Sequence, residues 1–163
     1  MKDSWLIIAA IVLLIFLVTT QVDMSYSEVL KSINSNYGSY VYQKSNQFGV
    51  PYRRVLAIIA QESRGNASAM GPTGDVGLMQ ITQPAFTDSN NQWGFGYTYD
   101  QMTLPMPNID IGIGFLAILQ GEFSGDIDKA TQAYNAGAGA VKADPTASID
   151  YLNSVKQIES QII

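Results

Sequence analysis

The sequence predicts a mainly α-helical domain preceded by a single apolar N-terminal helix. Apolar residues recur at helical spacing in several segments, which is typical of helices that pack one face on a core. Glycine- and proline-rich stretches such as residues 66–77 separate these segments and predict loops. The 163 residues suffice for one domain with a core. We therefore divide the chain into a transmembrane anchor, residues 1–24, and a helical domain, residues 25–163.

The predicted anchor is an uncharged run over residues 4–22, almost wholly apolar from residue 5 to residue 18. At 1.5 Å per residue the run would span roughly 28 Å, close to the thickness of a bilayer's hydrocarbon core. We expect residues 5–22 to cross a lipid bilayer once, with the domain outside because a lysine precedes the span and acidic residues follow it. A signal-peptide core is the alternative, although no small-x-small cleavage site follows.

The first helix of the domain is predicted from a capping box at Ser25–Glu28 and continues through Ile33. Residues 34–39 form a polar stretch that contains a glycine, and we expect it to interrupt the helix. A second short helix over residues 40–47 would then end at Gly49.

The next helix carries an acidic residue on its apolar face. Pro51 suits its first turn, and Gly65 can take the left-handed conformation that ends many helices. Glu62 lies at the same helical spacing as apolar residues that precede it: Val55, Ile58 and Ile59. Burial and the negative end of the helix dipole both raise the pKa of such a carboxyl, toward the range of a general acid at neutral pH. The alternative is a solvated glutamate in a fraying last turn.

The amino-acid composition excludes several classes of catalytic site. The chain contains no cysteine and no histidine, which excludes Ser–His and Cys–His nucleophile systems and most zinc sites. We predict neither a metal nor a cofactor, so acid–base chemistry falls to carboxylates, tyrosines or lysines. Between residues 62 and 128 there are eight acidic residues and one basic residue. This charge repels phosphate backbones and argues against nucleic-acid binding.

The remaining elements follow from periodicity and punctuation. We expect Leu78–Ile81 to begin a helix packed beneath the site, and an aromatic segment over residues 90–100 to connect helices. The two proline residues at 105 and 107 would close that connection. Three further helices are predicted, with a loop between the last two: a helix that opens at Asn108 or Asp110 and runs to about residue 123, helices 126–134 and 148–162, and loop 141–146.

Three motifs in this order carry a family resemblance: QES at residues 61–63, GLMQITQPA at 77–85 and AYNAGAGAV at 133–141. Together with Pro107–Ile109 and Tyr151, the chain resembles the lytic transglycosylases of the goose-type-lysozyme superfamily over about residues 50–155. The resemblance implies a lysozyme-like fold with a glycan cleft.

The activity implied by the resemblance is cleavage of peptidoglycan at the β-1,4 bond between N-acetylmuramic acid and N-acetylglucosamine. Glu62 would be the single acid and base, and a 1,6-anhydromuramyl end would form. Two alternatives stay open: a muramidase that hydrolyses the bond as goose-type lysozymes do, and a non-catalytic glycan-binding or assembly protein of the same fold.

The resemblance also implies substrate-binding residues around Glu62. Ser63 would orient the glutamate, or bond only to nearby backbone. Met79 would line the cleft, or pack in the core. Gln80 would offer its amide to a sugar.

Three later residues complete the implied set. Tyr134 would hydrogen-bond the carboxyl of Glu62 and set its protonation. Asn135 would bind an acetamido group, or cap its own helix. Tyr151 would help to fix the glutamate, or lie half-buried in the core.

Two positions depart from the family pattern. The family often has serine where Gly71 stands and a small residue where Asp75 stands. Asp75 would be either a second carboxylate that activates water, as in an inverting hydrolase, or a loop-capping residue.

The aromatic residues at positions 93, 95, 97 and 99 would point the same way if their segment were extended, either to stack on sugars or to cover the core. For biological context we expect an extracytoplasmic domain in a bacterial envelope, with a secretion apparatus or a membrane-containing phage virion as hypotheses for its partners.

Overall fold

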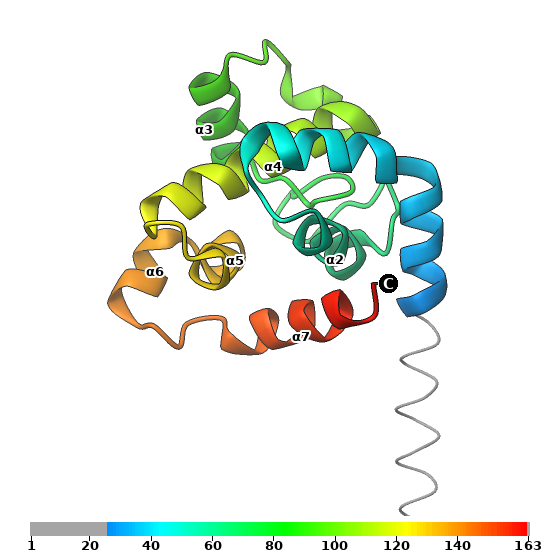
Figure 1. The fold of residues 1–163 in the computed structure, drawn as a ribbon. Helices are drawn as coiled ribbons and strands as arrows, with labels where there is room; N and C mark the ends of the chain where they lie inside the picture. Colours follow the sequence, from blue (N-terminus) through cyan, green and yellow to red (C-terminus); the bar gives the residue numbers. More distant parts are fainter. Residues whose placement is uncertain (1–25, 163) are drawn as a thin grey trace, which may run out of the picture.

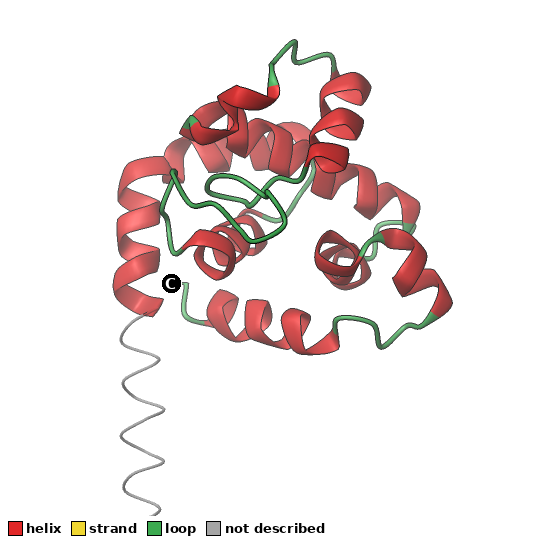
Figure 2. Ribbon diagram, turned by 180° about the vertical axis from the view of Figure 1, so that it is seen from behind, coloured by secondary structure: helices red, strands yellow, loops and turns green. Residues whose placement is uncertain are grey.

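The computed structural model describes residues 26–162, and this part of the chain is built from helices and loops (Figures 1 and 2). The prediction of a mainly α-helical domain is therefore confirmed. The expected anchor at residues 1–24 lies outside the described residues. Among residues 26–162, no helix is both long and apolar enough to cross a membrane.

The N-terminal helix runs without interruption over residues 26–48, so the predicted break at residues 34–39 is wrong. The polar residues are used in a tertiary contact, because Asn34 Oδ1 accepts a hydrogen bond from the hydroxyl of Tyr52. A Cβ at Gly38 would lie 2.2 Å from the same Oδ1. Gly38 therefore makes room for that contact and does not mark a turn.

Helix α2, Tyr52–Ser63, carries the core of the domain, and residues 54–60 are all buried. The N-terminal helix and α7 lie on different sides of it (Figure 1). Pro51 is the N-cap, one residue before the first helical turn in which we expected it. At the other end Arg64 adopts the left-handed conformation with φ 54°, and Gly65 follows with φ 82°.

The segment after α2 differs from prediction, because Leu78–Ile81 does not begin a helix. Val76 and Ile81 exchange backbone hydrogen bonds of 3.1 and 2.9 Å and enclose a turn. Two positive φ angles, 82° at Gly77 and 47° at Gln80, are incompatible with a helix there. Helix α3, Gln83–Trp93, begins only after Thr82, whose side chain caps it.

Helix α4, Pro105–Glu122, follows the short 3₁₀ helix η1, Tyr99–Thr103. The prolines at 105 and 107 lie in its first turn and do not close the preceding loop, which corrects the predicted start; proline costs no hydrogen bond there. Two glycines of α4 lie where neighbouring segments approach it closely. A Cβ at Gly114 would lie 2.5 Å from Ser89 Oγ of α3, and one at Gly112 would lie 2.3 Å from Met79 Sδ.

Three helices complete the domain: α5, Ile127–Ala136; α6, Ala138–Ala143; and α7, Ile149–Ser160. The predicted loop at 141–146 is wrong in its first half, because α6 continues through alanine residues of high helix propensity to Ala143. In both views the C-terminal end of α7 lies beside the start of the N-terminal helix (Figures 1 and 2).

Arg54 joins α2 to both α5 and α7. Its side chain is 6% exposed and forms ion pairs of 2.9 Å with Asp128 and 2.8 Å with Glu159. Its Nη1 also donates to Thr131 Oγ1 at 2.8 Å. A buried guanidinium with its donors satisfied fixes the packing of these three helices.

Candidate active site

Glu62 lies in the last turn of α2, where α7 crosses it. The hydroxyl of Tyr151 in α7 donates a hydrogen bond to Glu62 Oε1. Burial raises the pKa of Glu62, the hydrogen bond from Tyr151 lowers it and the charge of Asp75 raises it, and the net result is a pKa of about 7. The result is a carboxyl that can hold or release a proton near neutral pH.

Glu62 opens into a small cleft of about 140 Å³. Its lining comes from the loop after α2, from the start of α3 and from the end of α5: Glu62, Thr73, Asp75, Gln80, Thr82, Tyr134 and Asn135. A second hollow of about 280 Å³ shares Gln80, Thr82, Tyr134 and Asn135 with it and continues to Phe115 and Gly137. The two form one groove, of which Glu62 lines one end.

The turn that carries Gln80 is tied to three helices. Ser63 Oγ of α2 donates to the carbonyl of Leu78 at 2.8 Å, and Tyr134 of α5 donates to the carbonyl of Met79 at 2.8 Å.

From α4, Asn108 Oδ1 accepts a hydrogen bond of 2.8 Å from Met79 N. The amide of Asn108 also donates to the carbonyls of Val76 and Met102, both at 2.8 Å. These bonds hold the floor of the cleft in one position.

Three of the predicted residues bond to backbone carbonyls or pack in the core. The Ser63 hydroxyl bonds to backbone carbonyls, as in the second interpretation of this residue. Met79 is fully buried and packs against Gly112, so its side chain belongs to the core. The Tyr134 hydroxyl donates to the Met79 carbonyl, whereas we expected it to bond to the carboxyl of Glu62. Burial and, to a smaller extent, the charge of Glu62 raise the pKa of Tyr134, so this phenol stays neutral.

Of the other three, Gln80 and Asn135 line the cleft and Tyr151 contacts Glu62. Gln80 Nε2 donates to the carbonyl of Gly77 at 2.9 Å, and its side chain lines the cleft. Asn135 is exposed, and its Oδ1 accepts from Ser148 Oγ at 2.5 Å. The Tyr151 hydroxyl donates to Glu62 Oε1, as in the first interpretation of this residue, and it makes the hydrogen bond that we expected from Tyr134.

Sequence reasoning missed the part played by Asn108, which is fully buried and makes three hydrogen bonds to backbone. The signal was present as an asparagine directly after Pro107 in the first turn of α4. Its partners, however, lie up to 32 residues away in the sequence, as for Val76. Such contacts leave no local periodicity.

The aromatic residues after α3 cover the core, as in one of the two interpretations. Phe95 stacks on Tyr97 with ring centroids 5.8 Å apart, and Tyr99 meets Phe86 edge to face at 5.5 Å. The Tyr97 hydroxyl donates to Asp110 Oδ2 at 2.8 Å. Trp93 is part of α3 and donates from its indole to the carbonyl of Gly114. The segment is thus not an extended row of aromatic side chains.

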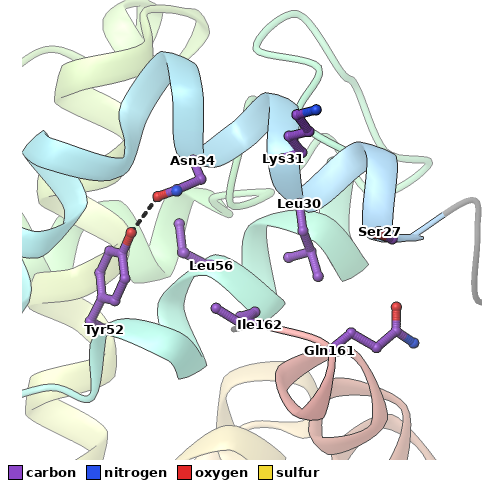
Figure 3. Close-up of a pocket in the computed structure, with 8 residues that line it drawn as sticks. All are labelled: Ser27, Leu30, Lys31, Asn34, Tyr52, Leu56, Gln161 and Ile162. Atoms are coloured by element: carbon purple, nitrogen blue, oxygen red, sulfur yellow. Dashed lines mark hydrogen bonds between the residues drawn. The ribbon is translucent and has the colours of Figure 1, made fainter.

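Within residues 26–162, no group of three or more acidic side chains comes together as metal ligands would. A separate groove of about 270 Å³ lies between the N-terminal helix, α2 and the C-terminal end (Figure 3). Tyr52 and Asn34 face each other across one side, and Leu30, Leu56 and Ile162 form its apolar wall. None of its lining residues is shared with the cleft at Glu62.

The fold is that of the lysozyme-like transglycosylase domains. It is similar to the 70-kDa soluble lytic transglycosylase of Escherichia coli, with a TM-score of 0.71 and 25% identity, covering 77% of this chain and 24% of that one. The family model described as the transglycosylase SLT domain matches residues 39–151. The chain therefore belongs to the transglycosylase SLT domain family.

Curated relatives agree with this assignment. Membrane-bound lytic murein transglycosylase C of Edwardsiella ictaluri is 34% identical over 137 residues, covering 73% of this chain and 37% of that protein. The protein of the same name from Serratia proteamaculans is 32% identical over 138 residues, covering 74% of this chain and 37% of that protein. The chain thus spans little more than a third of the length of the curated relatives it matches.

Proposed function

We propose that this domain is a peptidoglycan lytic transglycosylase in which Glu62 is the single acid and base. The observation that carries the proposal is a glutamic acid at one end of a groove, with its pKa raised to about 7 by burial. Membership of the SLT family and the names of the curated relatives support murein as the substrate. No cofactor is required.

The first step uses the protonated form of Glu62. Its proton passes to the glycosidic oxygen between N-acetylmuramic acid and N-acetylglucosamine, and the bond from that oxygen to C1 of the muramyl residue breaks. The substrate's own N-acetyl group stabilises the positive charge at C1, so a second protein carboxylate is not needed. Because the site is partly withdrawn from water, enough of the acid is protonated near pH 7.

The second step uses the carboxylate that remains. Glu62 takes the proton from the 6-hydroxyl of the same muramyl residue while that oxygen bonds to C1, which gives the 1,6-anhydro end and returns Glu62 to its starting state. Between the steps, the hydrogen bond from Tyr151 stabilises the charged carboxylate. Atoms and charges balance without any further reactant.

The other residues would bind the sugars or hold the groups that line the groove. Gln80 and Asn135 line the groove and would contact the sugars. Ser63 and Tyr134 would hold the turn that carries Gln80, and Met79 would pack beneath it. Tyr151 would set the orientation of Glu62.

For location, we propose that residues 1–24 anchor the protein, with residues 5–22 in the bilayer, and that residues 25–163 form the extracytoplasmic catalytic domain. The relatives' names describe them as membrane-bound. A secretion apparatus or a membrane-containing virion would fit an enzyme that opens the cell wall locally. Fractionation of the full chain between membrane and soluble material, before and after truncation of residues 1–24, tests the anchor.

Release of muropeptides from purified sacculi tests the activity. Wild type should solubilise sacculi, and Glu62→Gln should lose at least a hundredfold in rate, whereas Glu28→Gln on the exposed face of the N-terminal helix should not. Mass spectrometry of the products identifies the reaction. Anhydromuramyl ends support the proposal, reducing ends indicate a muramidase, and equal solubilisation by wild type and Glu62→Gln excludes Glu62 as the acid.

A further inference from the structure

Asp75 brings a second carboxylate into the cleft that contains Glu62. It closes a tight turn that begins at Gly71, with backbone hydrogen bonds from Gly71 N to Asp75 O at 2.8 Å and from Gly74 N to Gly71 O at 3.2 Å. The hydroxyl of Thr73 donates to Asp75 Oδ1. The turn therefore folds the carboxylate back over its own backbone and fixes one of its two oxygens.

The other oxygen explains why residue 71 is a glycine. Gly71 does not have a positive φ, so the backbone conformation alone would allow a side chain there. A Cβ at this position, however, would lie 1.8 Å from Asp75 Oδ2. The carboxylate of Asp75 thus occupies the space that a side chain at residue 71 would need.

The turn is held rigidly against the floor of the cleft. The hydroxyl of Tyr99 lies 2.8 Å from the carbonyl oxygen of Gly74 and 2.8 Å from that of Ile81. Within residues 26–162, Asp75 Oδ2 accepts no hydrogen bond, in contrast to Oδ1. Asp75 is half-buried and lines the cleft, and its carboxylate is held at Oδ1 while Oδ2 has no donor among the described residues, so the side chain is a preorganised acceptor.

We propose that Asp75 is a substrate-binding residue, whose Oδ2 accepts a hydrogen bond from an O–H or N–H group of the glycan strand lying against Glu62. This inference rests on the proposed function. The sugars of peptidoglycan carry hydroxyl and acetamido N–H donors, and a carboxylate binds such donors more strongly than a neutral oxygen does. Asp75 would contribute to affinity and not to proton transfer, which stays with Glu62.

Kinetics on soluble, uncrosslinked glycan strands test the proposal. Asp75→Asn keeps the shape but removes the charge, and it should raise the half-saturating concentration about tenfold while kcat changes less than about threefold. Asp100→Asn, an exposed acid in η1, is the matched control for the loss of one negative charge and should match wild type. An unchanged half-saturating concentration for Asp75→Asn overturns the proposal. So does a loss confined to kcat with release of reducing ends, which would make Asp75 a base.

Gly71 provides an independent test. Gly71→Ala would push the carboxylate aside and should reproduce the effect of Asp75→Asn, but it should add nothing in an Asp75→Ala background, where the space is empty. Additive effects of the two substitutions contradict the proposed arrangement. Thermal unfolding of each variant shows whether it remains folded.

Binding separates this inference from the proposed function. Retention on sacculi is compared for Glu62→Gln with and without Asp75→Asn, so that no cleavage occurs. Inactive wild type with weaker binding by the Asp75 variant refutes catalysis and supports the role of Asp75. If wild type is active and Asp75→Asn does not weaken binding, the catalytic proposal stands and the proposed role of Asp75 is refuted.

Discussion

Tyr151→Phe removes the hydroxyl that donates to Glu62 Oε1 and leaves the ring in place. This hydroxyl stabilises the charged form of the carboxyl and lowers its pKa, against the effect of burial. Without it, burial and the charge of Asp75 act unopposed, so the pKa of Glu62 should rise above its wild-type value of about 7. The acid would then stay protonated to higher pH.

The size of the effect follows from the strength of the bond. A hydrogen bond to a charged group contributes about 1.5–3 kcal/mol, and each 1.4 kcal/mol corresponds to one pKa unit. We expect the alkaline limb of the pH–rate profile to move upward by about one to two pH units. The maximal rate should fall, because the carboxyl loses the contact that orients it and the carboxylate formed after the first proton transfer loses its stabilisation.

The assay is kcat/KM for solubilisation of sacculi between pH 5 and pH 9, since this ratio reports ionisation of the free enzyme. Wild-type activity should fall as pH rises through about 7, where Glu62 loses its proton. Tyr42→Phe, at an exposed tyrosine of the N-terminal helix, should follow the wild-type profile. An alkaline limb that stays in place, or moves to lower pH, in Tyr151→Phe would refute the reasoning.

Three further predictions concern stability, each measured by urea unfolding. The folded pKa of Glu62 is raised from 4.5 to about 7, so its contribution to stability is fully present below pH 4.5 and is lost as pH rises through 7. Glu62→Gln should therefore be more stable than wild type by about 3 kcal/mol at pH 8 and nearly equal to it at pH 4.5. Gly112→Ala should destabilise by about 1–3 kcal/mol because its Cβ would meet Met79 Sδ at 2.3 Å, whereas Gly121→Ala, with no atom within 4 Å, should stabilise by up to about 1 kcal/mol. Arg54→Met should destabilise by about 3 kcal/mol because it leaves Glu159 without its ion-pair partner and Asp128 with Lys156 alone, and a cost below about 1 kcal/mol would show that the ion pairs do not fix the helices.

Local sequence signals predicted the helices that show a clear apolar stripe. Helices α2, α5 and α7 lie within two residues of expectation at most ends, because caps and periodicity act over a few residues. The errors occur where a contact with a distant part of the chain determines the local structure. Asn34 and Gly38 resemble a helix break in sequence, yet the Asn34 side chain bonds to Tyr52, Gly38 makes room for it, and the helix continues through both residues.

The acidic residue of the site was predictable from the sequence, but its contacts with distant residues were not. Glu62 stands out because it lies at a helical spacing that calls for an apolar residue. Its hydrogen-bond partner was not readable from the local pattern, since Tyr151 is 89 residues away, and the resemblance implied that bond for Tyr134 and a role in fixing the glutamate for Tyr151. The Asn108 and Asp75 contacts depend on the tertiary position of loops without periodicity. No local rule specifies them.

The contact between Glu62 and Tyr151 is one of a row of polar contacts between α2 and α7. Arg54 pairs with Glu159, and Ser154 Oγ donates to Gln61 Oε1 at 2.7 Å. Positions rise along α2 as they fall along α7, so the side-chain pairs fix how the two helices are placed against each other. A slip of one helical turn would move α7 by about 5.4 Å and separate Tyr151 from Glu62. The ion pairs at the far end of the interface therefore help to place the phenol that controls the acid, even though none of their members reaches the cleft.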